Sequence, residues 1–343
     1  MRRFFQKNNR VLRSMIVLFL SISIVLSGCG GEEPKPEEPE QTAQATSSDD
    51  DYHENAKSVE DGTMNADSVV ISVGETTVPY SEYRSYYYFM DHQYEELLGE
   101  EVWKQSIGDK TIGQIAIEDV LRMIIQVKVI VKEAERQGVI LEADEKEDAD
   151  YNANKLCESL DEKTKQESMI TSQEMMKIFE ENRLAEKMYH VITGQVGSDA
   201  SVSSAKAIEI LQLFKKADDS NRDQVNKEMQ SLQKKIASSD KSFYYHAKQE
   251  SELPEVQVIV GTLDERQNIW NTAESLEIGV VSPVIQEADG FYLIYVLKKN
   301  DEEMNNEYRN RVISENQTKS FQETYNEWSG HYAVEVSDAL LSE

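Results

Sequence analysis

The sequence predicts an α+β protein in which a largely helical body carries a small mixed unit towards its end. Over residues 111–192, apolar residues recur at the spacing of helices that bury one face. Over residues 205–300, short strand patterns and two short helices follow one another instead. A helical pattern over 305–328 and a strand pattern over 331–336 end the chain, so helices and strands are segregated as in α+β proteins.

The first folded segment is predicted to be a hairpin that leads into a helix. Residues 68–78 have strand character interrupted by a turn at Gly74-Glu75, and Ser81 has the residue type and place of a helix N-cap. The large apolar side chains that follow fit a hydrophobic core, and equally a groove for an unfolded chain: Tyr83, Tyr86, Tyr87, Phe89, Met90 and Tyr94.

The next region is predicted to be a series of helices. Apolar residues between 117 and 134 lie on one helical face, and Gly138 is a typical C-terminal stop. The helical pattern then continues over 142–192, with Met175 on an apolar face. Methionine fills irregular gaps in cores and also suits surfaces that accept varied partners, so both roles stay open for Met175.

The mixed unit is predicted to contain an antiparallel sheet over about a hundred residues. A tight turn at Asp289-Gly290 joins its last two strands. The expected elements are a strand at 207–214, helices at 220–236 and 243–251, and strands at 256–260, 280–285 and 291–297.

The first 28 residues have the composition of an export signal. Met1–Arg13 is basic, and Met15–Leu26 is an apolar run too short to span a bilayer. The following Leu-Ser-Gly-Cys, which ends at Cys29, resembles the lipobox of bacterial lipoproteins. This resemblance implies cleavage before Cys29 and lipid on its sulfur, which would anchor the protein on the extracytoplasmic side of the cell membrane. An ordinary signal peptide or a short anchor is the alternative.

The charge of the chain excludes nucleic acid as an expected partner. The net charge is −28, and loss of the five basic residues before Cys29 leaves 31 basic against 64 acidic side chains. Such a body repels DNA and RNA. Residues 29–66 are acidic and rich in Pro, Ser and Thr, with little to bury, and are predicted to form a disordered linker.

The reactive side chains indicate no cofactor and no metal site. With Cys29 lipidated, Cys157 has no intrachain partner and is expected to be a small buried apolar residue. The histidines do not have the spacing of metal ligands, and the acidic runs lack the spacing of a calcium loop. The histidines are His53, His92, His190, His246 and His331.

Several stretches match one known pattern in the same order. Residues 69–74, 80–83 and 128–139 are similar to the opening strand and the Glu-Ala-x-x-x-Gly helix end of an N-terminal chaperone domain. Residues 243–251 resemble the Phe-x-x-x-Ala-Lys-x-x-Ser helix of parvulins, and residues 276–296 resemble their closing Ser-x-Pro-Val and Gly-Phe-His segments. Together they resemble the PrsA and SurA type of extracytoplasmic foldase, which carries a parvulin (PpiC-type) peptidyl-prolyl isomerase domain.

This resemblance implies how the chain is divided into domains. A mostly helical SurA-like domain would be closed by the C-terminal helix and strand, and the parvulin-like domain would be inserted into it. The implied parts are a signal peptide at 1–28, the linker at 29–66, the chaperone domain at 67–198, the parvulin-like domain at 199–300 and the closing segment at 301–343.

The expected isomerase site departs from the family pattern. Parvulins usually carry one histidine in their first strand and one in their last strand. The counterparts in this chain are Glu209 and Tyr292, and the family's Gly-Gly-x-Leu-Gly loop is reduced to Gly261-Thr262-Leu263. Tyr292 can donate a hydrogen bond and Glu209 can accept one, but they do not reproduce an imidazole pair. The resemblance implies that Glu209 and Tyr292 occupy the two catalytic positions. The replacement of both histidines implies a weak or inactive isomerase.

The function expected from these features is a membrane-anchored chaperone or foldase for unfolded or nascent exported proteins. Its client-binding side chains would be Phe291 in the parvulin-like domain and Tyr83, Tyr87, Phe89 and Met175 in the helical domain. An active prolyl cis-trans isomerase with a divergent site is the first alternative, and a solute-binding lipoprotein is the second. A homodimer is left open.

Overall fold

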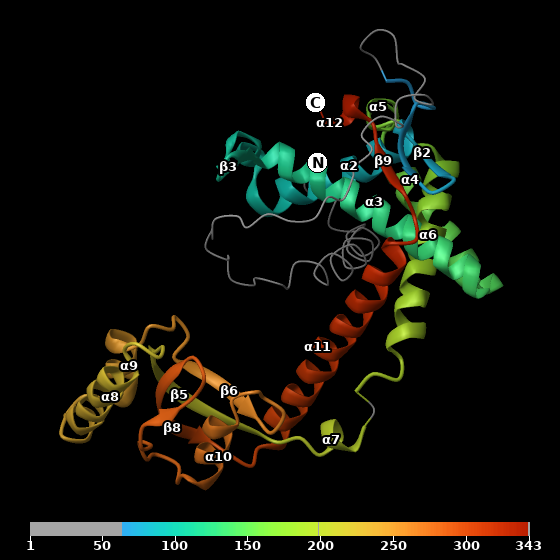
Figure 1. The fold of residues 1–343 in the computed structure, drawn as a ribbon. Coiled ribbons are helices and arrows are strands. Elements are labelled where there is room, and N and C mark those ends of the chain that lie inside the picture. Colours follow the sequence, from blue (N-terminus) through green and yellow to red (C-terminus); the bar gives the residue numbers. More distant parts are fainter. Residues whose placement is uncertain (1–63, 198, 342–343) are drawn as a thin grey trace, which may run out of the picture. The chain divides into compact units, whose positions relative to one another are not determined.

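The computed structural model describes residues 64–197 and 199–341, which form two compact units (Figure 1). Unit 1 consists of the described residues up to Gly194 and of those from Lys319 onward, and unit 2 is Gln195–Thr318. The predicted export signal, Cys29 and the acidic linker lie outside the described residues. The predicted α+β class is confirmed, with a small mixed unit inserted in a mostly helical one.

Three strands of unit 1, β1 (Val69–Val73), β2 (Thr76–Pro79) and β9 (Val334–Val336), form an antiparallel sheet in the order β2-β1-β9. Ile71 of β1 pairs with Val336 of β9, so the end of the chain completes a sheet that its beginning starts. Figure 1 shows β9 alongside the N-terminal hairpin. The expected closure of the helical domain by a C-terminal strand is therefore confirmed.

The helices of unit 1 follow local start and stop signals. Thr111 accepts a hydrogen bond from the Gln114 backbone, and Gly138 ends the long helix in the left-handed conformation, as predicted. The helical stretch after Glu142 divides into three helices, because Asp161 and Thr171 each cap a new start. The elements are α2 (Tyr80–Leu98), η1 (Glu100–Lys104), the short strands β3 (Ser106–Ile107) and β4 (Lys110–Thr111), α3 (Ile112–Gln137), α4 (Ala143–Ser159), α5 (Glu162–Glu167), α6 (Ser172–Thr193) and α12 (Asp338–Leu341).

The predicted N-cap at Ser81 is wrong. Pro79 is the cap residue of α2, and Ser81 already lies in the first turn, where its carbonyl accepts from Ser85 Oγ. Proline has an extended backbone there and no side chain that can cap. The start of α2 is instead tied to the strand, because the Tyr80 amide donates to the Ser68 carbonyl over 2.8 Å.

Unit 2 is built on a four-stranded antiparallel sheet in the order β6-β5-β8-β7. Side chains alternate between its faces, so Ile210, Phe214 and Ile294 pack with α10 on one face, while Leu213 and Leu293 pack with α8 and α9 on the other. The elements are α7 (Ala200–Ser203), β5 (Ala207–Lys216), α8 (Arg222–Ala237), α9 (Phe243–Glu250), β6 (Gln257–Gly261), α10 (Gln267–Ser275), β7 (Ile285–Gln286) and β8 (Gly290–Lys298).

The predicted strand over 280–285 is largely wrong. Val281 makes an isolated bridge, and regular pairing starts at Ile285. The carbonyl of Ser282 accepts from Gln233 of α8, while its Oγ accepts the Ile294 amide in the ladder. Pro283 then lacks the N–H that a continuous strand would use.

The long helix α11 (Glu302–Ser329) contributes to both units. In unit 2, Met304, Tyr308 and Val312 pack on Val202 and other residues that precede β5. In unit 1, Phe321, Tyr325 and Trp328 join the main core. No helix in the described part of the chain is both long and apolar enough to cross a membrane.

Candidate functional site

Tyr292 lies near the start of β8, on the sheet face that α10 covers. Its side chain is fully buried, and its ring lies 4.6 Å from the ring of Phe214 on the neighbouring strand. Its hydroxyl donates to Asp289 Oδ2 over 2.7 Å and accepts from Arg266 Nη1 over 3.1 Å. The Arg266 guanidinium also lies 5.5 Å from the ring centroid, which suits a cation–π contact. The Tyr292 side chain is therefore contacted both at its ring and at its hydroxyl group.

The electrostatics keep the Tyr292 hydroxyl protonated. Burial and the bond to Asp289 raise the pKa of Tyr292 to about 12, although Arg266 opposes the shift. The group therefore acts as a neutral hydrogen-bond donor over the physiological range. Both of these hydrogen bonds are made with residues of the same unit, so the hydroxyl already has a donor and an acceptor within the protein.

The walls around Tyr292 are apolar and buried. Ile269 and Trp270 come from α10, Ile285 from β7 and Ile294 from β8, each with an exposed fraction of 5% or less. The start of α10 is fixed to β7, since Glu287 Oε1 accepts the Ile269 amide over 3.0 Å. The side chains on this face of the sheet therefore form a closely packed core around the tyrosine.

The structure does not bring Glu209 and Tyr292 together. Tyr292 pairs with Phe214, whereas Glu209 pairs with Lys298, five residues further along the strand. At a rise of roughly 3.3 Å per residue, this places them about 16 Å apart along the sheet. Glu209 instead accepts a hydrogen bond from Gln257 over 2.6 Å at the exposed side of β5. A joint catalytic role, expected from the sequence, does not fit this separation.

Gln212 is the polar residue of β5 that shares the face of Tyr292. It pairs with Ile294, and directly opposite residues project from the same face of a sheet. Its side chain is 3% exposed, and its Nε2 donates to the Glu255 carbonyl. Its Oε1 has no hydrogen-bond partner among the described residues. Because residues two apart on a strand share a face, the position of Gln212 two residues before Phe214 could have identified it from the sequence.

Phe291 does not share a binding surface with Tyr292. Successive residues of a strand point to opposite faces, so Phe291 lies in the core under α8 and α9 and is 1% exposed. The expected surface around both residues is therefore not present in this structure.

The expected client-binding residues of unit 1 are mostly core residues. Tyr83, Phe89 and Met175 have exposed fractions of 4% or less and belong to one hydrophobic cluster. Tyr87 is partly buried at the edge of that cluster, where the Arg84 guanidinium lies 5.9 Å from its ring. Of these four side chains, Tyr87 therefore offers surface to a partner, while the other three stabilise the fold.

Two aromatic side chains that the sequence did not single out are half exposed on unit 2. Tyr244 and Tyr245 of α9 are 46% and 49% exposed. Lys248 lies 5.7 Å from the first ring and Lys241 lies 5.9 Å from the second. Exposed tyrosines can bind apolar and polar groups at once, which suits contact with varied chains.

The other reactive residues have structural surroundings. Cys157 is buried, and burial raises the pKa of its thiol, so the thiolate is disfavoured. His246 is buried, with Nε2 2.9 Å from Ser239 Oγ. Among residues 64–197 and 199–341, no cluster of His, Cys, Asp and Glu could hold a metal ion.

A family comparison identifies the domain that contains Tyr292. The model described as rotamase, PPIC-type PPIASE domain, matches residues 210–298. Residues 210–298 are therefore similar to rotamase domains of the PpiC type. The matched segment starts within β5 after Glu209 and ends at the last residue of β8, and includes Gln212 and Tyr292.

Two of the solved structures to which this chain is similar come from described foldases and chaperones. The PrsA peptidylprolyl isomerase of Bacillus anthracis is 16% identical over 61% of this chain and 97% of that chain, with a TM-score of 0.38. A structure from a study of the SurA-like chaperones PEB4 and Cj1289 of Campylobacter jejuni is 13% identical over 78% and 98%, with a TM-score of 0.29. No curated protein sequence matches the chain. The rotamase assignment follows from the family match.

Proposed function

We propose that this protein is an extracytoplasmic, lipid-anchored foldase that binds unfolded segments of exported proteins, its clients. We further propose that its rotamase domain binds these segments with little or no isomerase activity. The observation that carries the proposal is the full burial of Tyr292 in the PpiC-like segment, where its side chain packs with β5 and α10 on one face of the sheet.

The chemistry of prolyl isomerisation explains why a filled site matters. Rotation about an X–Pro bond crosses a barrier of roughly 18–20 kcal/mol and takes tens to hundreds of seconds without a catalyst. A catalyst needs no covalent nucleophile, but it must hold the proline in an open apolar pocket and favour the twisted amide. The ring of Tyr292 takes up space beside Phe214 and Trp270, and Arg266 lies over that ring.

Client binding is then assigned to exposed or partly exposed side chains outside the packed face. Tyr244 and Tyr245 on unit 2 and Tyr87 on unit 1 combine an accessible aromatic surface with a nearby cation. Aromatic side chains bury large areas at a small entropic cost, so such contacts can hold many sequences weakly.

The location of the protein is proposed from the sequence features at its start. A basic segment, an apolar run and the Leu-Ser-Gly-Cys ending at Cys29 support export and lipid attachment. In the host cell, Cys29→Ser is expected to release the protein from the membrane fraction, while Cys157→Ser leaves it there. Membrane retention of Cys29→Ser would contradict the anchor.

Two assays on the purified protein test the proposal. Near-stoichiometric amounts are expected to suppress aggregation of a reduced model protein, and proline-limited refolding should proceed at the rate seen in buffer. Tyr244→Ala with Tyr245→Ala should weaken suppression, whereas Ile140→Ala, which shortens an exposed side chain that is not aromatic, serves as the control. Failure to suppress aggregation would contradict the proposed chaperone role.

A second candidate, an active isomerase with a divergent site, is favoured by one observation. Gln212 Oε1 is a buried acceptor with no hydrogen-bond partner among the described residues, on the same face as Tyr292. If the protein accelerates proline-limited refolding and Gln212→Leu abolishes that acceleration, this candidate replaces the first. The solute-binding alternative gains no support, because all strand pairs of the described residues are antiparallel.

A further inference from the structure

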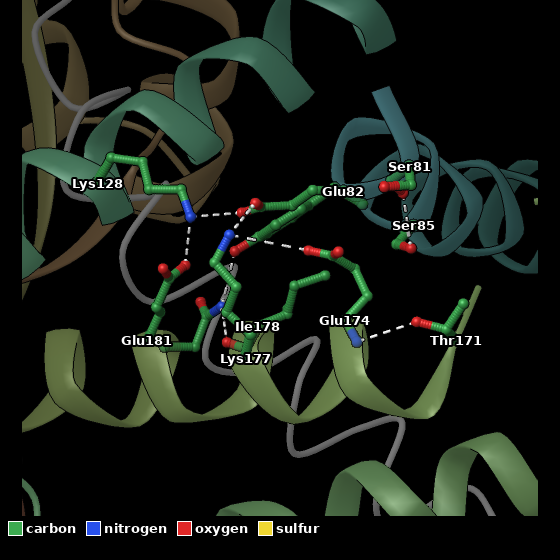
Figure 2. Close-up of polar contacts among 11 residues, drawn as sticks. Ser81, Glu82, Ser85, Lys128, Thr171, Glu174, Lys177, Ile178 and Glu181 are labelled. Atoms are coloured by element: carbon green, nitrogen blue, oxygen red, sulfur yellow. Dashed lines mark hydrogen bonds and ion pairs between the residues drawn. The ribbon is translucent and has the colours of Figure 1, made fainter. Parts of the chain in front are cut away.

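Five charged side chains meet inside unit 1 where α2, α3 and α6 come together (Figure 2). Lys128 Nζ lies 2.5 Å from both Glu82 Oε1 and Glu181 Oε2. Lys177 Nζ lies 2.7 Å from Glu82 Oε2 and 3.9 Å from Glu174 Oε1. In Figure 2, dashed lines join the carboxyl group of Glu82 to both lysines, which reach it from α3 and from α6. We call these five residues the junction cluster.

The junction cluster does not balance its own charge. If every group is ionised, three carboxylates face two ammonium groups and one negative charge is in excess. Glu82 is fully buried and Lys128 is 1% exposed, so solvent screens this charge poorly. The described residues hold no group suited to a metal ion that could neutralise it. A proton is the simplest species that can remove the excess charge.

The uncharged polar neighbours add no compensating charge. Asn182 Nδ2 donates to Tyr86 Oη over 2.9 Å, and Asn182 Oδ1 is buried without a hydrogen-bond partner among the described residues. Burial and the charge of Glu82 raise the pKa of Tyr86, so the phenol stays neutral. These two residues therefore leave the charge excess to the carboxylates.

Glu174 is the carboxyl group least supported by a partner. Its Oε1 is buried and has no hydrogen bond, and its distance of 3.9 Å from Lys177 is too long for one. By contrast, Glu82 contacts two lysines, and Glu181 accepts a hydrogen bond from the Lys128 ammonium group. Burial and the neighbouring Glu82 raise the pKa of Glu174, and burial also raises that of Glu181.

We propose that the junction cluster is a proton-binding site, and that Glu174 takes up the one proton that balances the charge of the cluster. The proton leaves two carboxylates facing two lysines, so the three helices are held together by a balanced cluster. The contribution of this proton to the stability of unit 1 is fully present below the ordinary pKa of a glutamate. This stability is lost as the pH rises through the raised pKa, because the folded state binds the proton more tightly than the unfolded chain.

A titration and a matched pair of variants test this proposal on the purified protein. Carbon NMR of labelled glutamate carboxyls should show one group that titrates above the others, and this signal should vanish in Glu174→Gln. The melting temperature of Glu174→Gln should exceed that of wild type by about 2–4 °C at pH 8, with the gap closing as the pH falls towards the ordinary pKa of a glutamate. Glu158→Gln is the control, since that side chain on α4 is 70% exposed.

The possible contrary outcomes are distinct. If every glutamate titrates in the ordinary range, no proton is bound and the proposal is overturned. If Glu174→Gln melts below wild type at pH 8, an ionised Glu174 stabilises the fold and the proposal is equally overturned. If the signal that titrates at the highest pH survives in Glu174→Gln, the assignment to Glu174 is overturned. The titration of the wild-type protein decides the first case even where the variant does not fold.

Discussion

Unit 1 and unit 2 bury polar side chains in different ways. Unit 1 places five charged groups at the contact of α2, α3 and α6, with Lys128 and Glu82 almost fully excluded from solvent. Unit 2 buries Tyr292, a neutral group whose hydroxyl has a donor and an acceptor. The interior of unit 1 therefore responds to protons, while the interior of unit 2 depends on shape.

This difference bears on the function proposed for each unit. A buried ion pair contributes little net stability, but removal of one member leaves an unpaired charge at a large cost. A packed ring such as that of Tyr292 contributes through its buried area and its close contacts. Substitutions that remove a buried charge should therefore lower the stability of unit 1. Substitutions that change the volume of a buried side chain should lower the stability of unit 2.

The largest expected effect comes from Lys128→Met. This change leaves Glu82 and Glu181 without their shared ammonium, and should destabilise unit 1 by about 3–5 kcal/mol. Amide hydrogen exchange should accelerate in α3 and α6, while β8 keeps its protection. Lys146→Met is the control, because Lys146 is 57% exposed where it pairs with Glu180. Equal loss of protection in both units would show that they do not unfold separately.

A volume change in unit 2 is expected to come second. A Cβ added to Gly261 would lie 2.0 Å from the ring of Tyr308, so Gly261→Ala should destabilise unit 2 by about 3 kcal/mol. Faster exchange in β6 and β5 measures this effect. The control is Gly113→Ala in α3, where the nearest atom is 3.8 Å away and alanine favours the helix. An unchanged β6 would show that Tyr308 can move aside at little cost.

The same glycine shows what the sequence could and could not predict. The sequence identified Gly261 as the remainder of a family loop, but the reason for a glycine there is Tyr308, 47 positions later. Local signals such as the Thr111 cap and the Gly138 stop predicted α3 correctly, because they depend on neighbouring residues. Long-range contacts carry no such local signature.

The candidate sites also divide into features that local sequence patterns predict and features that depend on long-range contacts. The opposite orientation of Phe291 and Tyr292 follows from strand periodicity and was open to prediction, as was the position of Gln212. The junction cluster was not, because Glu82 and Lys128 have the residue types of solvent-exposed positions. Their burial becomes visible once α2, α3 and α6 are placed together.

A third prediction concerns a carboxylate of unit 1 with the opposite pH response. Burial opposes ionisation of Glu133, but hydrogen bonds from Arg136, His331 and Tyr332 outweigh it and lower its pKa. The bonds therefore stabilise the attachment of the C-terminal segment above the ordinary glutamate pKa, and this is lost as the pH falls through the lowered value.

Glu133→Gln should then destabilise unit 1 by about 2 kcal/mol at neutral pH, since hydrogen bonds to a charged group are lost. Chemical unfolding at pH 7 and pH 3 measures it, with the difference from wild type shrinking in acid. Glu135→Gln on the exposed side of α3 is the control. An equal loss at both pH values would mean that the shape of the side chain matters and its charge does not.

The smallest expected effect is that of Tyr292→Phe, which removes the hydroxyl and keeps the ring. Asp289 and Arg266 lie at the exposed rim and can bind water instead, so the expected loss in unit 2 is about 1 kcal/mol. Because the ring still fills the face, proline-limited refolding should stay at the rate seen in buffer. Tyr295→Phe, on the opposite face of β8, is the control for a lost tyrosine hydroxyl. A gain of isomerase activity in Tyr292→Phe would show that the hydroxyl network, rather than the volume of the ring, closes the site.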